Sequence, residues 1–173
     1  MWARIFRTAP ALALMLLAML AASRASGQVA TRAASFADWI VYRHGAGAER
    51  TCFALSQPTV RQGQSAEGVG SYVMVSAWPR HGVKAQPSIY AGAPFRGGSS
   101  VSITIKGDTF TLFTDGDRAF VDDPTMELKL VDAMKKGNTM LVRGVLASGG
   151  QMFDTYSLSG VTQAVNAVSQ DCG

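Results

Sequence analysis

The sequence predicts a mainly β protein: one antiparallel sandwich or barrel with two short helices. Short segments with alternating apolar and polar residues recur along most of the chain, and glycine-containing turns separate them. Only two segments have the apolar spacing of a helix. The chain has 173 residues, 47% of them hydrophobic and 16% charged, which is enough apolar material for a single core and too apolar for a disordered protein.

The first 25 residues have the order of a secretory signal peptide. Two arginines precede a Leu- and Ala-rich run, residues 9–22, and small residues follow it. These small side chains predict cleavage before Ser26 or, alternatively, before Gln28. An uncleaved anchor is the other interpretation, but this run is shorter than the roughly 20 apolar residues that cross a membrane. We therefore expect a periplasmic, secreted or outer-surface protein with no integral membrane span after cleavage.

Cleavage also changes the charge of the protein. The formal net charge of the whole chain is +4, and the removed segment carries Arg4, Arg7 and Arg24 without any acid, so the mature chain keeps a charge of +1. Nucleic-acid binding needs a clustered excess of positive charge. The mature chain lacks that excess, and we expect no nucleic-acid partner.

A loose leader, residues 26–36, is expected to precede one domain, residues 37–173. Residues 57–70 are polar and glycine-rich and are expected to form a loop. Gly107 and Asp108 are expected to form a two-residue hairpin turn. The expected strands are Ala37–Arg43, Arg50–Leu55, Ser71–Trp78, Ser88–Gly92, Val101–Ile105, a strand through Phe110 and Leu112, Arg118–Val121, Asn138–Ala147 and Gln151–Leu158.

The first expected helix begins at Asp123 and Pro124 and ends at Gly137. A carboxylate before the helix can accept hydrogen bonds from its free N–H groups, and proline is tolerated at the first helical position. The residues Met126, Leu130, Val131 and Met134 share one apolar face. The second expected helix is the last segment of the chain, with Val161, Ala164, Val165 and Val168 toward the core.

Two cysteines, Cys52 and Cys172, remain after cleavage. In an oxidising compartment a single pair without metal-ligand spacing indicates one disulfide, and two free thiols are the alternative. Such a bond would fix the C-terminus to an early strand.

The sequence offers little that suggests catalysis. His44 and His81 are the only histidines, and no HExxH, CxxC or GxSxG motif occurs. The Asp-Gly-Asp sequence at 115–117 lacks the further ligands of a calcium loop and is better explained as a turn. We expect no catalytic residue, no metal site and no cofactor.

One stretch, from Trp78 to Arg96, combines aromatic and basic side chains in the way that is typical of binding surfaces. The candidate partner surface consists of Trp78, Arg80, His81, Lys84 and Arg96, with Tyr90 and Phe95 between them. Core aromatics that alternate with solvated charges on ordinary strands are the simpler explanation.

Several short motifs together resemble one known family. They are Asp38-Trp39, Cys52–Leu55 (CFAL), the Pro94-Phe95 turn with the glycines after it, Leu112-Phe113, Val131–Gly137 (VDAMKKG), Leu141–Gly144 (LVRG), Asp154–Gly160 (DTYSLSG) and the terminal Cys172. Their order along residues 37–172 is similar to that of the invasion-associated locus B family of Gram-negative bacteria.

The resemblance implies an immunoglobulin-like β sandwich, export to the envelope or surface, and a connection with entry into host cells. It implies no catalytic residues. The sequence thus favours a non-catalytic exported domain that binds a protein or cell surface that the sequence does not identify. A periplasmic enzyme, or a protein that binds a small ligand at an unrecognised site, is the alternative.

Overall fold

The protein is described here by a computed structural model, which covers residues 29–63 and 70–172. The expected signal peptide and its cleavage sites lie outside the described residues. Their role in export stays a prediction.

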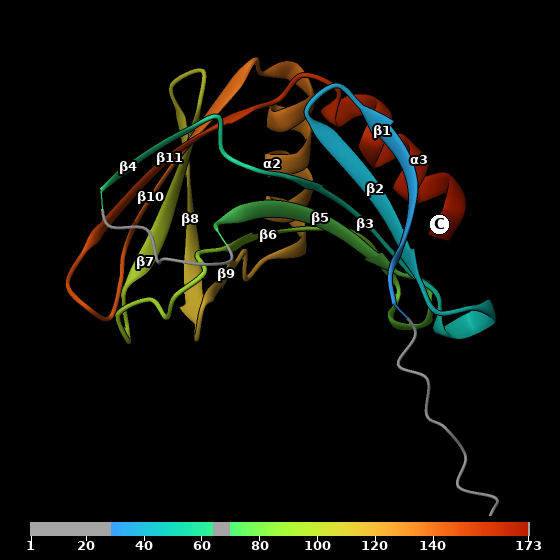
Figure 1. Cartoon of the computed structure of the whole chain (residues 1–173), viewed down its shortest axis with the longest axis horizontal. Coiled ribbons are helices and arrows are strands. Elements are labelled where there is room, and N and C mark those ends of the chain that lie inside the picture. Colours follow the sequence, from blue (N-terminus) through green and yellow to red (C-terminus); the bar gives the residue numbers. More distant parts are fainter. Residues whose placement is uncertain (1–28, 64–69, 173) are drawn as a thin grey trace, which may run out of the picture.

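Within the described residues, eleven strands form one antiparallel sheet (Figure 1). Their order in the sheet is β1-β2-β3-β5-β6-β9-β8-β7-β10-β11-β4. The strands are β1 (Thr31–Phe36), β2 (Trp39–His44), β3 (Thr51–Ser56), β4 (Val60–Gly63), β5 (Tyr72–Trp78), β6 (Val83–Tyr90), β7 (Ser100–Ile105), β8 (Asp108–Asp115), β9 (Arg118–Phe120), β10 (Thr139–Val145) and β11 (Gln151–Ser157). Two short 3-10 turns, η2 (Gly47–Glu49) and η3 (Pro79–His81), lie between strands.

The mainly β prediction is confirmed, but the immunoglobulin-like sandwich is not. Hydrogen bonding is continuous across the whole sheet, because β9 joins β6 to β8 and β10 joins β7 to β11. The sheet is nevertheless folded on itself. Ser71, immediately before β5, forms a hydrogen bond with Asp154 in β11, six positions away in the strand order. The two halves of one sheet therefore enclose the core that we expected two separate sheets to enclose.

Two segments that we expected to be irregular form edge strands. Residues 31–36 of the expected leader are β1, which pairs with β2 and directs Ala33, Ala34 and Phe36 toward the core. Part of the expected loop is β4, which pairs with β11. All four residues of β4 are exposed. Both strands lack a clear apolar alternation, so the sequence pattern does not reveal them.

The β7–β8 turn is shifted by one residue from its expected position. Its two central residues are Lys106, with φ of 50°, and Gly107, with φ of 95°. A two-residue turn that matches the strand twist needs positive φ at both central positions, and a glycine at the second is the usual solution. Asp108 therefore belongs to β8 instead of the turn.

The first helix, α2 (Pro124–Lys136), forms where we predicted it. The Asp123 side chain accepts hydrogen bonds from the N–H groups of Thr125, at 2.6 Å, and Met126, at 3.1 Å. Leu130, Val131 and Met134 are buried. At the C-terminal end, a Cβ on Gly137 would lie 2.6 Å from Ile105 and 2.8 Å from Leu158. The helix thus ends at a glycine because its neighbours leave no room for a side chain.

The second helix, α3 (Val161–Cys172), packs on β1, β2, β3, β5 and β6 (Figure 1). Its buried residues are Val161, Ala164, Val165, Val168 and Cys172. Cys172 forms a disulfide with Cys52 of β3, with a Cα–Cα distance of 5.8 Å. The fully buried Trp39 donates a hydrogen bond from Nε1 to the Ser157 carbonyl at 3.1 Å. The helix thus covers one face of this half of the sheet.

Candidate binding surface

The structure places four of the five predicted surface residues at one end of the β5–β6 hairpin. Trp78 is the last residue of β5 and is half-buried. Arg80 and His81 are exposed in η3, and Lys84 is exposed near the start of β6.

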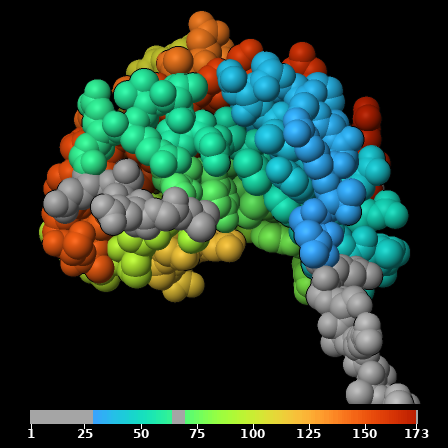
Figure 2. Space-filling model, viewed as in Figure 1, coloured from blue at the N-terminus to red at the C-terminus, as the bar shows by residue number. Residues whose placement is uncertain are grey.

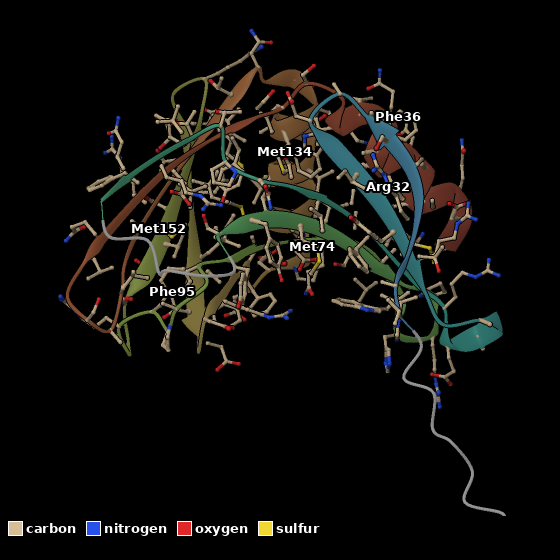
Figure 3. All side chains as sticks on the ribbon, in the orientation of Figure 1. Arg32, Phe36, Met74, Phe95, Met134 and Met152 are labelled. Carbon is tan, nitrogen blue, oxygen red and sulfur yellow. A yellow bond between two sulfur atoms is a disulfide. The ribbon has the colours of Figure 1, made fainter. Side chains whose placement is uncertain are left out.

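Arg96 does not belong to this group, and the predicted surface is split. The N–H of Arg96 bonds to the Val145 carbonyl at 2.8 Å, and the preceding Phe95 bridges to Leu146. Phe95 is only 4% exposed and lies toward the β10 and β11 side of the molecule (Figure 3). The length of β6, roughly 24 Å for eight residues, separates Arg96 from the η3 end. Proximity in sequence led us to group residues that the strand carries to opposite ends.

The η3 end gathers further cations that we did not predict. Arg43 and His44 end β2, and Arg50 precedes β3, so all three reach this end of the sheet. We call this group the basic end; it consists of Arg43, His44, Arg50, Arg80, His81 and Lys84. All six residues are exposed.

Two carboxylates partly balance the basic end. Arg43 forms an ion pair with Asp171 of α3 at 2.6 Å, and Arg80 pairs with Glu49. Arg50 donates to the Asp171 backbone carbonyl at 3.3 Å, where the helix C-terminus carries partial negative charge. A cleft of about 480 Å3 is lined by Val29, Thr31, Arg43, Gly45, Arg50 and Asp171. Four Lys and Arg residues against two carboxylates leave an excess of positive charge.

The sheet face opposite α3 carries a group of large apolar side chains. We call it the aromatic face; it consists of Ile40, Tyr42, Phe53, Leu55, Tyr72, Met74, Tyr90 and Phe120. Strand register places them on one side of β2, β3, β5, β6 and β9, because Ile40, Leu55, Met74, Ser88 and Phe120 are successive cross-strand partners. The eight residues are all half-buried, so each keeps part of its surface accessible among the described residues.

We call the five cross-strand partners Ile40, Leu55, Met74, Ser88 and Phe120 the central row. An aromatic pair lies on each side of it. Tyr42 stacks on Phe53 with ring centroids 5.4 Å apart, and Tyr72 stacks on Tyr90 at 4.6 Å. The Arg118 guanidinium lies 6.0 Å from the Tyr90 ring centroid, within the range of a cation–π interaction. Burial raises the pKa of Tyr72, and Arg118 partly offsets this, so the phenol remains a neutral hydrogen-bonding group. Rigid aromatics of this kind supply much contact area for little entropy loss.

The sequence held one signal for the aromatic face. In β2 both sets of alternating residues are apolar: Trp39 and Val41 face α3, while Ile40 and Tyr42 face the other way. A strand that is apolar on both sides needs cover on both sides. The described residues supply that cover on the α3 side alone, because α3 packs against these strands from that side.

The continuation of the same face over β7, β8, β10 and β11 is different. It presents Ser102, Thr104, Thr109, Thr111 and Thr155, with Phe113 46%, Leu141 40% and Phe153 39% exposed among them. Scattered apolar residues of this kind are normal on a protein surface. Phe113 packs against Phe120 with ring centroids 5.8 Å apart and extends the aromatic face onto β8. Beyond it, β7, β10 and β11 carry mostly polar residues on this side, so the aromatic side chains are concentrated in the half that lies beside the basic end.

A buried polar cluster lies inside the sheet, away from both surfaces. Asp154 is 2% exposed; its Oδ2 accepts hydrogen bonds from Ser71 and, at 3.4 Å, from the Tyr156 hydroxyl. Arg61 of β4 donates to the Ser71 carbonyl at 3.4 Å. Burial raises the pKa of Asp154 and of Tyr156. Because these groups connect β4, β5 and β11 within the core, we interpret the cluster as structural.

The described residues show no arrangement with an evident catalytic role. Within residues 29–63 and 70–172, no group of three or more His, Cys, Asp or Glu side chains could hold a metal ion. A cleft of about 560 Å3 between α2 and the β7–β8 turn is lined chiefly by lysine, aspartate and apolar side chains. No described helix is long and apolar enough to cross a membrane.

The described part of the chain defines a mainly β protein built on one folded antiparallel sheet with two helices. The chain belongs to the Invasion associated locus B (IalB) protein family, whose family model matches residues 39–169. The predicted resemblance is confirmed. Among solved structures, the chain is similar to the crystal structure of invasion associated protein B from Bartonella henselae, with a TM-score of 0.53 and 12% sequence identity. That match covers 81% of this chain and 95% of the other, and it supports the fold alone. A comparison with curated proteins found no significant match.

Proposed function

We propose that this protein is an exported, non-catalytic domain of the bacterial envelope or cell surface, and that it binds a protein or cell-surface partner. The observation that carries the proposal is the aromatic face, which adjoins the basic end through Trp78. Apolar aromatic area beside a rim of arginines is the composition of a protein-binding surface. The family name and the B. henselae relative described as invasion associated support a contribution to host-cell entry.

Several features support export to the periplasm or outer surface. The signal-like first segment fits a secreted chain, and the Cys52–Cys172 disulfide suits an oxidising compartment. Mass spectrometry of the protein purified from the envelope fraction should find an N-terminus at Ser26 or Gln28. An intact Met1 in that fraction would overturn cleavage.

Binding is tested with a pair of variants, one for each of the two parts into which the structure divides the predicted partner surface. Arg80→Ser combined with Lys84→Ser removes two cations from the basic end, and Arg96→Ser is the matched control at the other end of β6. All three substitutions remove exposed charges, so thermal melting should be unchanged. Retention of labelled protein on host cells or envelope extracts should fall in the double variant alone.

The salt dependence of retention gives a second measurement. Exposed charges more than about 10 Å apart are largely screened at 0.1 M salt, so the double variant should differ most from the wild type at low salt. If the wild-type protein is retained by neither host cells nor envelope extracts, the binding function is wrong.

A further inference from the structure

We propose that the aromatic face binds an amphipathic helix of an acidic partner protein, laid across strands β2, β3, β5, β6 and β9. The inference rests on the proposed binding function and names the class of partner for it.

The shape of this half of the sheet suits a cylindrical partner. Strands β5 and β6 are arched, and Met74 points to the concave side of the arch (Figure 3). Figure 2 shows the lower margin of the molecule hollowed between the β8–β9 turn and the basic end. The central row that contains Met74 therefore lies on the concave side of the arched strands, and we call this concave surface the trough and the central row its floor. The Tyr42–Phe53 and Tyr72–Tyr90 pairs lie on its two sides.

The spacing of the floor residues matches a helix. Neighbouring strands lie about 4.8 Å apart, and successive turns of an α-helix are about 5.4 Å apart. From Ile40 on β2 to Phe120 on β9 the row crosses five strands, a span of about 19 Å, which corresponds to a helix of roughly 13 residues. A helix laid along the row would place approximately one apolar side chain of its stripe over each strand.

Other partners fit this surface less well. An extended peptide that adds to a sheet needs unpaired backbone groups, and β3, β5 and residues 88–90 of β6, which carry the centre of the aromatic face, are already paired on both sides. A sugar needs polar groups that hold its hydroxyls. The described residues of β2, β3, β5 and β6 include no Asp, Glu or Asn. A helix fits better, because its apolar stripe needs only side chains to pack against.

The charges around the trough define the flanks of the helix. Arg32 is the cross-strand neighbour of Tyr42 at the β1 edge, and His44 lies two residues beyond Tyr42. On the other side Arg118 is the neighbour of Tyr90, but Asp117, which pairs with it at 3.9 Å, and Asp115 across the strand offset its charge. Beyond His44 and Trp78 the basic end continues the positive surface. Carboxylates on the side of the stripe that faces Arg32, His44 and the basic end would meet these cations, whereas lysines there would be repelled.

The test uses a display library of 18-residue helical peptides. Each has an apolar stripe at i, i+4, i+7 and i+11, and the flanking positions vary among Glu, Lys and Gln. Selection on the full mature protein should enrich helices with acidic flanks. Enrichment of basic flanks, equal recovery of all flanks, or recovery no better than from a library with scrambled stripes would overturn the inference.

Variants of the protein then locate the bound peptide. Met74→Glu places a carboxylate on the trough floor, and Tyr42→Ser removes one wall aromatic with less risk to folding. Each should weaken the enriched peptide about tenfold or more. Phe153→Ser is the matched control, because Phe153 is an exposed aromatic on the same sheet face but on β11. Unchanged affinity in both trough variants, or an equal loss in the control, would overturn the assignment. The broader binding function would still be upheld in that case if wild-type protein is retained on cells and the Arg80→Ser, Lys84→Ser double variant is not.

Discussion

The Ser71 hydroxyl donates a hydrogen bond to Oδ2 of Asp154, although the two residues are 83 positions apart in the chain. This bond ties the start of β5 to β11, across the interior of the folded sheet. The other carboxylate oxygen, Oδ1, is buried and has no hydrogen-bond partner among the described residues. A charged carboxylate with an unsatisfied oxygen is costly in a core, and burial accordingly raises the pKa of Asp154, with the Ser71 hydrogen bond opposing the shift.

Asp154 should therefore make the stability of the protein fall as pH rises. The folded state holds the Asp154 proton more tightly than the unfolded chain, whose carboxyl titrates near pH 3.9. Above that pH the folded state binds more protons than the unfolded state, so the free energy of unfolding decreases with pH until the raised pKa is passed. Asp154→Asn removes this titration.

Urea unfolding of wild type and Asp154→Asn from about pH 4 to pH 7 measures the effect. We expect the variant to gain stability relative to wild type as pH rises. Asp123 has a lowered pKa because the N–H groups of Met126 and Thr125 stabilise its charge, but it is present in both proteins and cancels in the difference. A stability difference between the two proteins that does not change with pH would show that folding does not raise the pKa of Asp154.

Loss of the disulfide should destabilise the protein by about 2–5 kcal/mol. Cys52 and Cys172 are separated by 120 residues, and their bond holds the last turn of α3 against β3. The double change of Cys52 and Cys172 to Ser frees that turn without leaving a reactive thiol. Chemical denaturation gives the free-energy difference, and thiol labelling of unreduced, denatured wild type should find no free cysteine. Two labelled thiols per chain would contradict the bond.

The buried face of α2 gives a matched pair of substitutions. Met134 is fully buried, whereas Leu128 on the same helix is 64% exposed. Met134→Asp places an unpaired carboxylate in the core, which should abolish soluble protein. Leu128→Asp introduces the same group into solvent, where surface changes usually alter stability by less than about 0.5 kcal/mol. Equal expression and melting temperature in the two variants would mean that the helix packs by another face.

Local patterns in the sequence predict the elements that depend on local chemistry. The Asp123-Pro124 start of α2 and the last helix form as expected, because a cap and an apolar stripe act within a few residues. The β1 and β4 edge strands do not follow from local pattern. Exposed β4 acquires its structure from β11, which is about 90 residues away in the chain.

The candidate surface was predictable only in part, for the same reason. Trp78, Arg80, His81 and Lys84 stay together because a hairpin end keeps neighbours together. Arg96 leaves the group because β6 carries the chain away first. Arg43 and Arg50 join it through pairing of β2 with β3, and the aromatic face depends on the register of five strands. Register of this kind is a property of the assembled sheet, which the sequence does not display.

A close approach between Gly160 and Phe36 yields the last prediction. Gly160 precedes α3 with φ of 91°, and a Cβ at that position would lie 2.0 Å from the Phe36 carbonyl oxygen. Gly107 has a similar φ of 95°, but a Cβ there would meet nothing within 4 Å. At both positions a side chain would carry the conformational cost of positive φ, about 1–2 kcal/mol. Only at Gly160 would it also overlap with neighbouring atoms.

Gly107→Ala should therefore lower stability by that conformational cost alone. Gly160→Ala should lower it by clearly more, because the backbone of β1 or the start of α3 must move to relieve the overlap. Urea denaturation of both variants against wild type gives the two free-energy differences. Protease digestion should in addition cut Gly160→Ala faster within residues 29–38, since β1 is an edge strand held on one side by β2. Equal losses in the two variants would show that β1 does not press on Gly160, and that the contact between the first strand and the last helix is looser than 2.0 Å implies.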